Sequence, residues 1–427
     1  MKILITSDLY PPVLNGVATF AHNLAKGMVA RGHDVIVIAP SQTGKRYEEM
    51  LDGVKVYRPR AVIFPFYQNV RICVTPQLEV RKIIQEFQPD VIHNQMPLGI
   101  GQAATMVGKA YDMPIVSTSH AMPENLMENL KKLSAFSRPI NYMLADFGRR
   151  YHSRSDVVTT PTESGLAGFS KHVAKIGSPL KVISNGINLK DFTPGKAPAS
   201  IYKKYGLPTD KKIITTLSRI DAEKHIWVLL HAFKEVLEQE DAHLLIVGAG
   251  VDLENLKTIA CDLGIDEHVT FTGRLPEEDK ADIHRVGTLF AVASPVELQC
   301  IAALEAMASG QPVVAVEAGA LGELCHDGKN GYRFGFDDYH GAAEAILKVL
   351  RDDALREKFS KESLAMARAN DLEFTLDAFT KLYKSVIKSK QAEIAARPAG
   401  FVDRLKESEL AEYFEFWSNE DDEAKSK

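Results

Sequence analysis

The chain has 427 residues, a length that suggests two or three domains. Hydrophobic residues make up 45% of it, so each domain can bury a core, and the formal net charge of −5 does not suit a nucleic-acid-binding protein. The four cysteines stand far apart without a Cys-x-x-Cys pair, which argues against a zinc site or a disulfide framework and favours reduced thiols in a cytosolic protein.

The N-terminal sequence MKILITSDLYPP lacks the pattern of a signal peptide, because its apolar run is short and an acid follows at once. No stretch approaches the roughly 18 apolar residues of a spanning helix. We therefore expect a cytoplasmic protein, either free or peripheral at the inner face of the membrane.

The first half of the chain alternates predicted strands with predicted helices. Residues 2–8 and 34–40 are apolar runs typical of strands buried on both faces, and 18–32 has helical periodicity with Gly32 as its C-cap. Such a βαβ unit predicts parallel strands joined by a right-handed crossover. Further strands are predicted at 54–58, 90–95, 114–120, 157–161 and 181–186.

Three prolines and two glycines interrupt this rhythm in 188–208, which predicts a linker between domains at 191–210. The pattern then restarts, with strands predicted at 211–219, 243–250, 268–274, 289–294, 312–317 and 331–336. We expect two Rossmann-like, doubly wound α/β domains with parallel sheets of about six strands each, facing a central cleft. Their predicted limits are 1–190 and 211–370, followed by closing helices at 371–396, which would pack back on the first domain, and a charged tail at 397–427.

Two acids, Glu297 and Glu305, frame an apolar stretch that follows a predicted strand. Glu297 falls in the turn between that strand and a predicted helix, and Glu305 falls about one and a half turns into the helix. The free N–H groups at a helix start bind anions, so a phosphate would sit between the acids. Glu297 would then accept hydrogen bonds from sugar hydroxyls and Glu305 would bind a ribose diol. The alternative is a capped core helix whose acids are solvated.

Two cations, Arg219 and Lys224, follow the first strand of the second half. They suit a diphosphate, with the guanidinium as a fork and the ammonium as a point charge. The alternative is an exposed helix start with unrelated charges. The chain has no Asp-x-Asp, so we expect no metal and no other cofactor, with these cations and a helix dipole supplying the positive charge.

Other residues near predicted strand ends give weaker signals. Gly16 would let the backbone approach a phosphate or sugar, and His120 would face the cleft and donate to a sugar hydroxyl or phosphate. His93 ends another strand in the same way, and a structural role is the alternative for both histidines. The Gly-x-Gly in 247–256 lacks the third glycine of a dinucleotide fingerprint, and Asn185 with the following glycine predicts a tight turn.

With these residues assembled, the chain resembles a family 4 glycosyltransferase of the GT-B fold. The resemblance extends over roughly residues 1–385. It is carried by Glu297 and Glu305 with EAMASGQPVV, by Arg219 and Lys224 in SRIDAEKH, by NGI at 185–187, by residues 9–35 and by His120.

The resemblance implies a retaining, metal-independent enzyme that moves a hexose from a nucleotide sugar to an acceptor hydroxyl. Glu297 would contact donor-sugar hydroxyls and Glu305 the ribose, while Arg219 and Lys224 would hold the diphosphate. Gly16 would lie beside the diphosphate and His120 would contact the sugar from the first domain. Arg219, Lys224, Glu297 and His120 form the predicted catalytic set, and Cys300 and Ile301, at the helix start, complete the predicted nucleotide-sugar-binding set.

The chain also departs from the family, because ELQC replaces the usual EGFG after the first acid, with Leu298 and Cys300 in place of glycines. Gln299 resembles the glutamine in the sequence TQG of bacterial diacylglycerol glucosyltransferases. This resemblance points to a lipid acceptor such as diacylglycerol. UDP-glucose is the favoured donor and GDP-mannose the next. The alternatives are a soluble sugar or sugar-phosphate acceptor and a non-catalytic nucleotide-sugar-binding protein.

Residues 131–154 carry six Lys/Arg and one acid, Asp146, with apolar residues interleaved. A basic helix with an apolar face can lie on an anionic membrane. The alternative is that the apolar residues pack on the first sheet and the cations are solvated.

Overall fold

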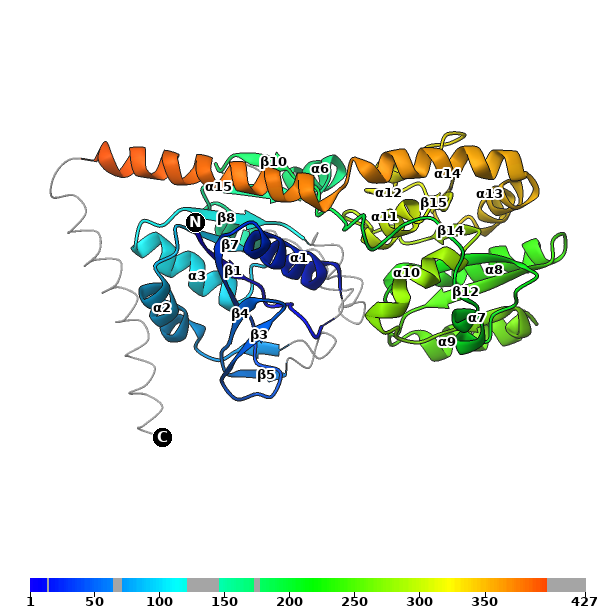
Figure 1. Cartoon of the computed structure of the whole chain (residues 1–427), viewed down its shortest axis with the longest axis horizontal. Helices are drawn as coiled ribbons and strands as arrows, with labels where there is room; N and C mark the ends of the chain where they lie inside the picture. The colour runs from blue at the N-terminus through cyan, green and yellow to red at the C-terminus, as the bar shows by residue number, and fades with distance from the viewer. Residues whose placement is uncertain (14, 64–70, 121–145, 173–176, 398–427) are drawn as a thin grey trace.

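The computed structural model describes residues 1–13, 15–63, 71–120, 146–172 and 177–397. They form two α/β domains side by side, as Figure 1 shows, with the N-terminal half in blue to green-cyan and the C-terminal half in green to orange.

The N-terminal domain is built on an eight-stranded sheet with the order β10-β9-β8-β7-β1-β2-β4-β3. All seven strands predicted in this half are present and parallel, and they are joined by an antiparallel edge strand, β3, that was not predicted. A small antiparallel pair, β5 and β6, was also not predicted. The strands are β1 (Lys2–Thr6), β2 (Asp34–Ile38), β3 (Tyr47–Leu51), β4 (Val54–Arg58), β5 (Ala61–Ile63), β6 (Arg71–Cys73), β7 (Val91–Asn94), β8 (Ile115–Thr118), β9 (Val157–Thr160) and β10 (Leu180–Val182).

Helix α1 (Gly16–Ala30) covers this sheet with the apolar face that its periodicity predicts. Phe20 and Met28 on that face are at most 1% exposed. The side chain of Asn15 caps the helix start by accepting from the Ala18 N–H, and Gly32 ends the helix in the left-handed region with φ +77°. The other helices of this domain are α2 (Pro76–Phe87), α3 (Gly99–Ala110) and α6 (Glu163–His172).

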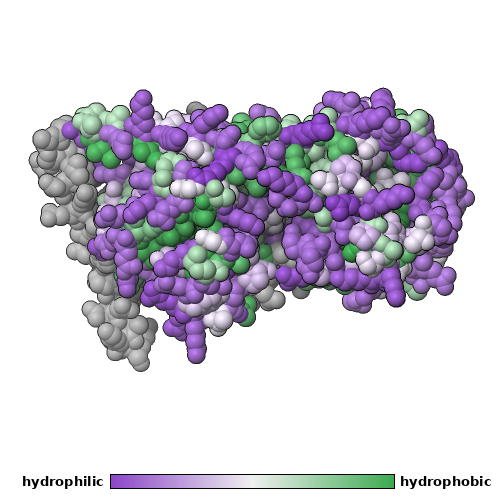
Figure 2. All heavy atoms as spheres, in the orientation of Figure 1, coloured by the Kyte–Doolittle hydropathy of each residue, from purple (hydrophilic) through white to green (hydrophobic). Residues whose placement is uncertain are grey.

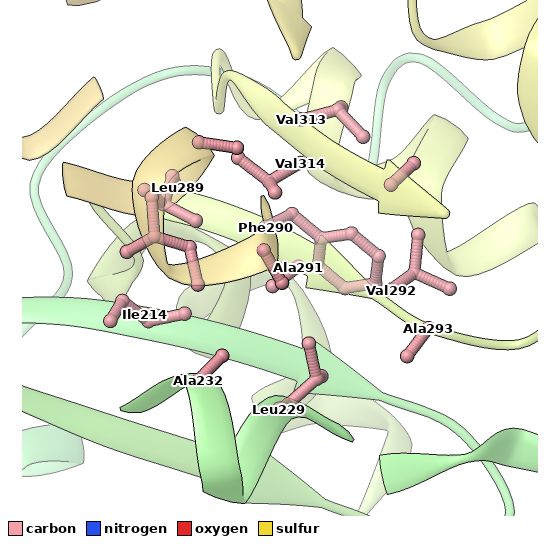
Figure 3. Close-up of a cluster of buried hydrophobic side chains, with 14 of the residues drawn as sticks. Ile214, Leu229, Ala232, Leu289, Phe290, Ala291, Val292, Ala293, Val313 and Val314 are labelled. Carbon is pink, nitrogen blue, oxygen red and sulfur yellow. The ribbon is translucent and has the colours of Figure 1, made fainter. Parts of the chain in front are cut away.

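The C-terminal domain has a six-stranded, wholly parallel sheet, as predicted, and the order of its strands is β13-β12-β11-β14-β15-β16. Figure 3 shows the core around the strand β14. Phe290 of this strand lies in one buried cluster with Val314 of β15, Ile214 of β11 and Leu229 of α8. The strands are β11 (Lys212–Leu217), β12 (Ala242–Val247), β13 (Val269–Phe271), β14 (Leu289–Val292), β15 (Val313–Val316) and β16 (Gly331–Phe334). The helices are α7 (Ala199–Tyr205), α8 (Ile226–Leu237), α9 (Leu253–Asp262), α10 (Glu277–Val286), α11 (Ile301–Ala308), α12 (Leu321–Leu324), α13 (Tyr339–Arg351), α14 (Asp353–Arg368) and α15 (Leu372–Ala395), with 3-10 turns η2 (Ala222–Lys224) and η3 (Asp266–His268).

The predicted linker at 191–210 contains helix α7, which packs on the C-terminal domain. Ile201 shares a hydrophobic cluster with Ile213 of β11 and Leu245 of β12. Pro198 stands at the start of α7 and Gly206 ends it with φ +65°. The residues interpreted as breakers therefore delimit a short helix, and the chain has already entered the second domain there.

Helix α15 returns to the N-terminal domain, and Figure 1 shows it in orange along that domain. Leu376 and Phe379 join the same buried cluster as Ile3 of β1. His93, predicted as a weak candidate for the cleft, is instead fully buried and structural: its ring bonds Tyr383 of α15 (2.7 Å) and Thr118 (2.7 Å).

Hydrophilic residues cover most of the face shown in Figure 2. Within the described ranges, the helices are all too short or too polar to cross a membrane.

Candidate active site

Two helix starts meet at the boundary between the domains. Helix α11 begins at Ile301 and helix α1 begins at Gly16. A β-carbon added to Gly16 would lie 3.7 Å from Cδ1 of Ile301, so these two N-termini lie close together across the boundary. The start of a helix carries N–H groups without intrahelical partners and the positive end of the helix dipole, which together suit an anion. At α1 one of these groups, the Ala18 N–H, is bonded by the Asn15 side chain.

The backbone before α11 explains one departure from the family. Cys300 is the N-cap of α11 and has φ +58°, in the left-handed region that glycine adopts without strain. A cysteine there costs on the order of 1 kcal/mol relative to glycine. The turn geometry is therefore kept although the glycine is absent. Leu298 has no such requirement, and its carbonyl oxygen accepts from the Thr162 hydroxyl of the N-terminal domain (2.7 Å).

Lys224 and Glu297 form an ion pair beside this helix start. Nζ of Lys224 lies 2.8 Å from Oε1 of Glu297, and the two side chains are 11% and 15% exposed. Burial alone would lower the pKa of Lys224, but the adjacent Glu297 carboxylate outweighs it and the pKa is raised, so the ammonium stays charged at neutral pH. The sequence did not predict that these residues, 73 positions apart, touch each other.

Arg219 lies in the loop after β11, where two acids hold its guanidinium. Asp221 and Glu223 each accept a hydrogen bond from it, and both acids are nearly fully buried. These acids orient the guanidinium and also offset its charge. A diphosphate at Arg219 would therefore share the guanidinium with them.

The Gly-x-Gly after β12 supports this arginine loop. A β-carbon on Gly248 would lie 1.9 Å from the Ser218 carbonyl oxygen, and one on Gly250 would lie 2.1 Å from that of Ile220. Only glycine lets the two loops pair this closely, through the Ile220 N–H to the Ala249 oxygen (3.0 Å). The motif has a backbone reason in this fold, separate from any dinucleotide.

Glu305 lies one turn into α11 and is 3% exposed. Nζ of Lys280 donates to its Oε1 (2.6 Å), and Nε2 of His284 lies 3.4 Å from its Oε2. Burial would raise the pKa of Glu305, but Lys280 and His284 together lower it, so the carboxylate is ionised. Lys280 and His284 both come from α10, and the sequence analysis missed them because an isolated Lys and His on a helix give no distinctive pattern.

His120 follows β8 and packs on Phe20 of α1, with ring centroids 5.1 Å apart. Its Nε2 lies 2.8 Å from Oε1 of Gln95. Burial lowers the pKa of His120 to about 3, so the imidazole is neutral. If the Gln95 oxygen accepts from Nε2, then Nδ1 is left as an acceptor, which suits a hydroxyl and not an anion.

The structure thus brings Arg219, Lys224, Glu297, Cys300 and Ile301 to one edge of the second sheet, and it brings Gly16 to face them from the first domain.

Of the basic segment 131–154, residues 131–145 lie outside the described residues. In the described remainder, Asp146 pairs with Arg149 (2.5 Å) and Arg150 (2.6 Å), and Phe147 is 44% exposed. Within the described part of the chain, His, Cys, Asp and Glu side chains form no group of three or more that could hold a metal ion.

Comparison with known proteins agrees with this architecture. The family described as "Glycosyltransferase Family 4" matches residues 14–191, and "Glycosyl transferases group 1" matches residues 199–366. The chain belongs to the family 4 glycosyltransferases and has their GT-B fold. It is 27% identical to an alpha-monoglucosyldiacylglycerol synthase of Streptococcus pneumoniae, over 99% of this chain and 100% of that protein.

Two further comparisons concern one curated relative and one solved structure. A GDP-mannose-dependent alpha-mannosyltransferase of Corynebacterium glutamicum is 25% identical over 83% of this chain and 81% of its own length. The solved structure of sucrose-phosphate synthase from Thermosynechococcus elongatus superimposes with a TM-score of 0.76 at 19% identity, covering 91% of this chain and 100% of that one. This last likeness concerns the fold.

Proposed function

We propose that the protein transfers a hexose from a nucleotide sugar to the hydroxyl of a diacylglycerol-type lipid, with retention of configuration at the anomeric carbon and without a metal. UDP-glucose is the favoured donor. The observation that carries the donor site is the convergence of Lys224, Glu297 and the start of α11 opposite Gly16. A lipid acceptor is supported by the glycolipid synthase that aligns over the whole chain.

In this proposal the diphosphate binds at the start of α11, where the helix N–H groups, Lys224 and Arg219 stabilise the negative charge that develops as it leaves. Glu297 accepts hydrogen bonds from the sugar hydroxyls. Its ion pair with Lys224 fixes the carboxylate beside the phosphates. Glu305, held ionised by Lys280, binds the ribose hydroxyls.

During transfer, the bond from the anomeric carbon to the diphosphate oxygen breaks and a bond from that carbon to the acceptor oxygen forms. The acceptor attacks from the face that the diphosphate leaves, and its proton passes to the departing phosphate oxygen. The neutral His120 contributes a hydrogen bond to a sugar hydroxyl and no charge. Closure of the two domains would exclude water, which otherwise competes as acceptor.

The test is an assay of the purified protein with UDP-glucose or GDP-mannose and three acceptors: diacylglycerol in mixed micelles, a hexose phosphate, and water alone. Mass spectrometry detects the product and NMR gives its anomeric configuration. We expect a monohexosyl diacylglycerol with the α configuration from UDP-glucose. Product with the hexose phosphate only would establish a soluble acceptor, and a product from GDP-mannose only would reassign the donor. The absence of any product, with nucleotide still bound, would favour a non-catalytic binding protein.

We also propose that the segment 131–154 attaches the enzyme to an anionic membrane. The variant Lys131/Lys132/Arg149/Arg150→Ser should lose sedimentation with anionic liposomes at low salt while keeping its circular dichroism spectrum. Wild type should be released as ionic strength rises. Equal recovery of wild type in the supernatant with anionic, neutral and no liposomes would contradict the proposal.

A further inference from the structure

The chain crosses between the domains twice, and the two crossings pair with each other. Ile187 leaves the N-terminal domain and forms a parallel bridge with Asp371, which leads into α15. The Ile187 N–H donates to the Asn370 oxygen (2.9 Å), and the Leu372 N–H donates to the Ile187 oxygen (2.9 Å). Any rotation of one domain against the other must change backbone angles in these two short segments.

The crossing is closely packed at Gly186, which has φ +69°. A β-carbon there would lie 2.5 Å from Oγ1 of Thr375 and 2.8 Å from Cα of Leu372. The tight turn predicted from NGI therefore lies where the two crossings meet, and a larger residue would force them apart. We call the paired segments 184–187 and 370–372 the hinge.

One glutamine of the loop between β14 and α11, residues 293–300, which we call the donor loop, is hydrogen-bonded to both crossings. Gln299 is 3% exposed, and its Oε1 accepts from the Asn185 N–H (2.9 Å). Its Nε2 donates to Oγ of Ser184 (2.6 Å) and lies 3.3 Å from Oδ1 of Asn370. The Ser184 hydroxyl in turn donates to Asn370 (2.7 Å). Both ends of the amide are thus bonded to the hinge, and none of these partners belongs to the donor loop itself.

The position of Gln299 in the chain links this hinge to the site. It stands two residues after Glu297, which pairs with Lys224, and two residues before Ile301, whose side chain lies close to Gly16 across the boundary. The carbonyl oxygen of its neighbour Leu298 accepts from Thr162 of the N-terminal domain. Consecutive residues of one loop therefore contact the donor site, the hinge and the opposite domain.

We propose that Gln299 is a positioning residue that couples occupancy of the donor site to closure of the domains. This inference rests on the proposed function. A diphosphate at the start of α11 fixes the loop that carries Gln299. Because the amide is bonded to Ser184, Asn185 and Asn370, a fixed loop selects one set of hinge angles, and the closed arrangement gains population when donor binds.

The test compares Gln299→Leu with a matched control, Gln311→Leu. Gln311 lies just past the opposite end of α11, is 2% exposed, and bonds Thr215 and the His284 oxygen within its own domain. Both substitutions remove a buried amide, so both lower stability, but only the first touches the hinge. Calorimetry measures binding of UDP, and small-angle X-ray scattering measures the radius of gyration with and without UDP.

We expect wild type and Gln311→Leu to become more compact when UDP binds. Gln299→Leu should bind UDP with affinity within about tenfold of wild type but lose this compaction, and its kcat should fall at least about tenfold with a smaller change in the donor KM. Ser184→Ala removes the hydroxyl that accepts from Gln299 and from the Gly186 N–H and donates to Asn370, while it leaves Gln299 itself in place. This variant should lose part of the compaction, and it tests the inference if Gln299→Leu does not fold.

Compaction of Gln299→Leu equal to that of wild type would overturn the inference, as would equal loss in both glutamine variants. UDP binding to wild type without any compaction would overturn it while leaving the donor site intact. Absence of both UDP and GDP binding to wild type would remove the proposed function and this inference together, and calorimetry separates that result from the others.

Discussion

Replacing Lys224 by methionine keeps most of the side-chain volume and removes the ammonium group beside Glu297. The two side chains keep 11% and 15% exposure, so the ion pair is partly screened. Breaking a fully buried pair costs about 3–5 kcal/mol, and with this exposure we expect a loss in the free energy of unfolding on the order of 1–3 kcal/mol. Turnover should fall about 10²-fold, as it does when one donor that stabilises developing charge is removed.

The double variant Lys224→Met/Glu297→Gln separates the two effects. It removes the unpaired carboxylate, so the free energy of unfolding, measured by urea denaturation, should recover to within about 1 kcal/mol of wild type. Turnover, measured as release of nucleoside diphosphate, should stay low because the phosphates still lack their cation and the sugar hydroxyls lose a charged acceptor. Near wild-type turnover in Lys224→Met would refute the charge-stabilisation argument, and recovery of turnover in the double variant would show that the loss came from the unpaired acid.

Three other predictions concern ribose, metal and pH. Glu305→Gln should weaken UDP binding at least about tenfold in calorimetry, because a ribose diol loses a charged acceptor; unchanged binding would remove the ribose role. Activity should persist in excess EDTA, and loss on chelation that magnesium or manganese restores would show that a metal supplies the positive charge. Burial lowers the pKa of His93, His120 and His152 to about 3 in the folded protein. Below about pH 6.5 these histidines bind protons in the unfolded chain but not in the folded protein. The free energy of unfolding should therefore fall as the pH drops towards 4, by about 2 kcal/mol per histidine at about pH 5. Equal denaturation midpoints at about pH 7.5 and pH 5 would contradict the neutral assignment.

The buried parallel strands were predictable because each is an apolar run bounded by turn residues. Edge strand β3 was not, because its sequence YEEML places two acids on a half-exposed strand that only its antiparallel partner β4 stabilises. Helix α7 was hidden because Pro198 and Gly206, which delimit it, lie among other breakers. In both places a neighbouring element decides the conformation, and single-chain patterns do not contain that information.

The residues of the candidate site were predictable as members of motifs, but not their pairing. Lys224 and Glu297 come from separate βα loops, and their contact depends on the order β11-β14 in the sheet. The partner of Glu305, Lys280, comes from a third segment. The hydrogen bonds of Gln299 were equally hidden, because its partners at 184–185 and 370 come from the two crossings between domains.

The central claim is that the boundary of the domains binds a nucleotide sugar through the start of α11. A crystal structure of the protein with UDP tests it most directly. We predict the diphosphate within hydrogen-bond distance of the α11 N-terminus and of Lys224 or Arg219, with the ribose at Glu305. A diphosphate bound elsewhere, or a ribose that does not reach Glu305, would contradict the account.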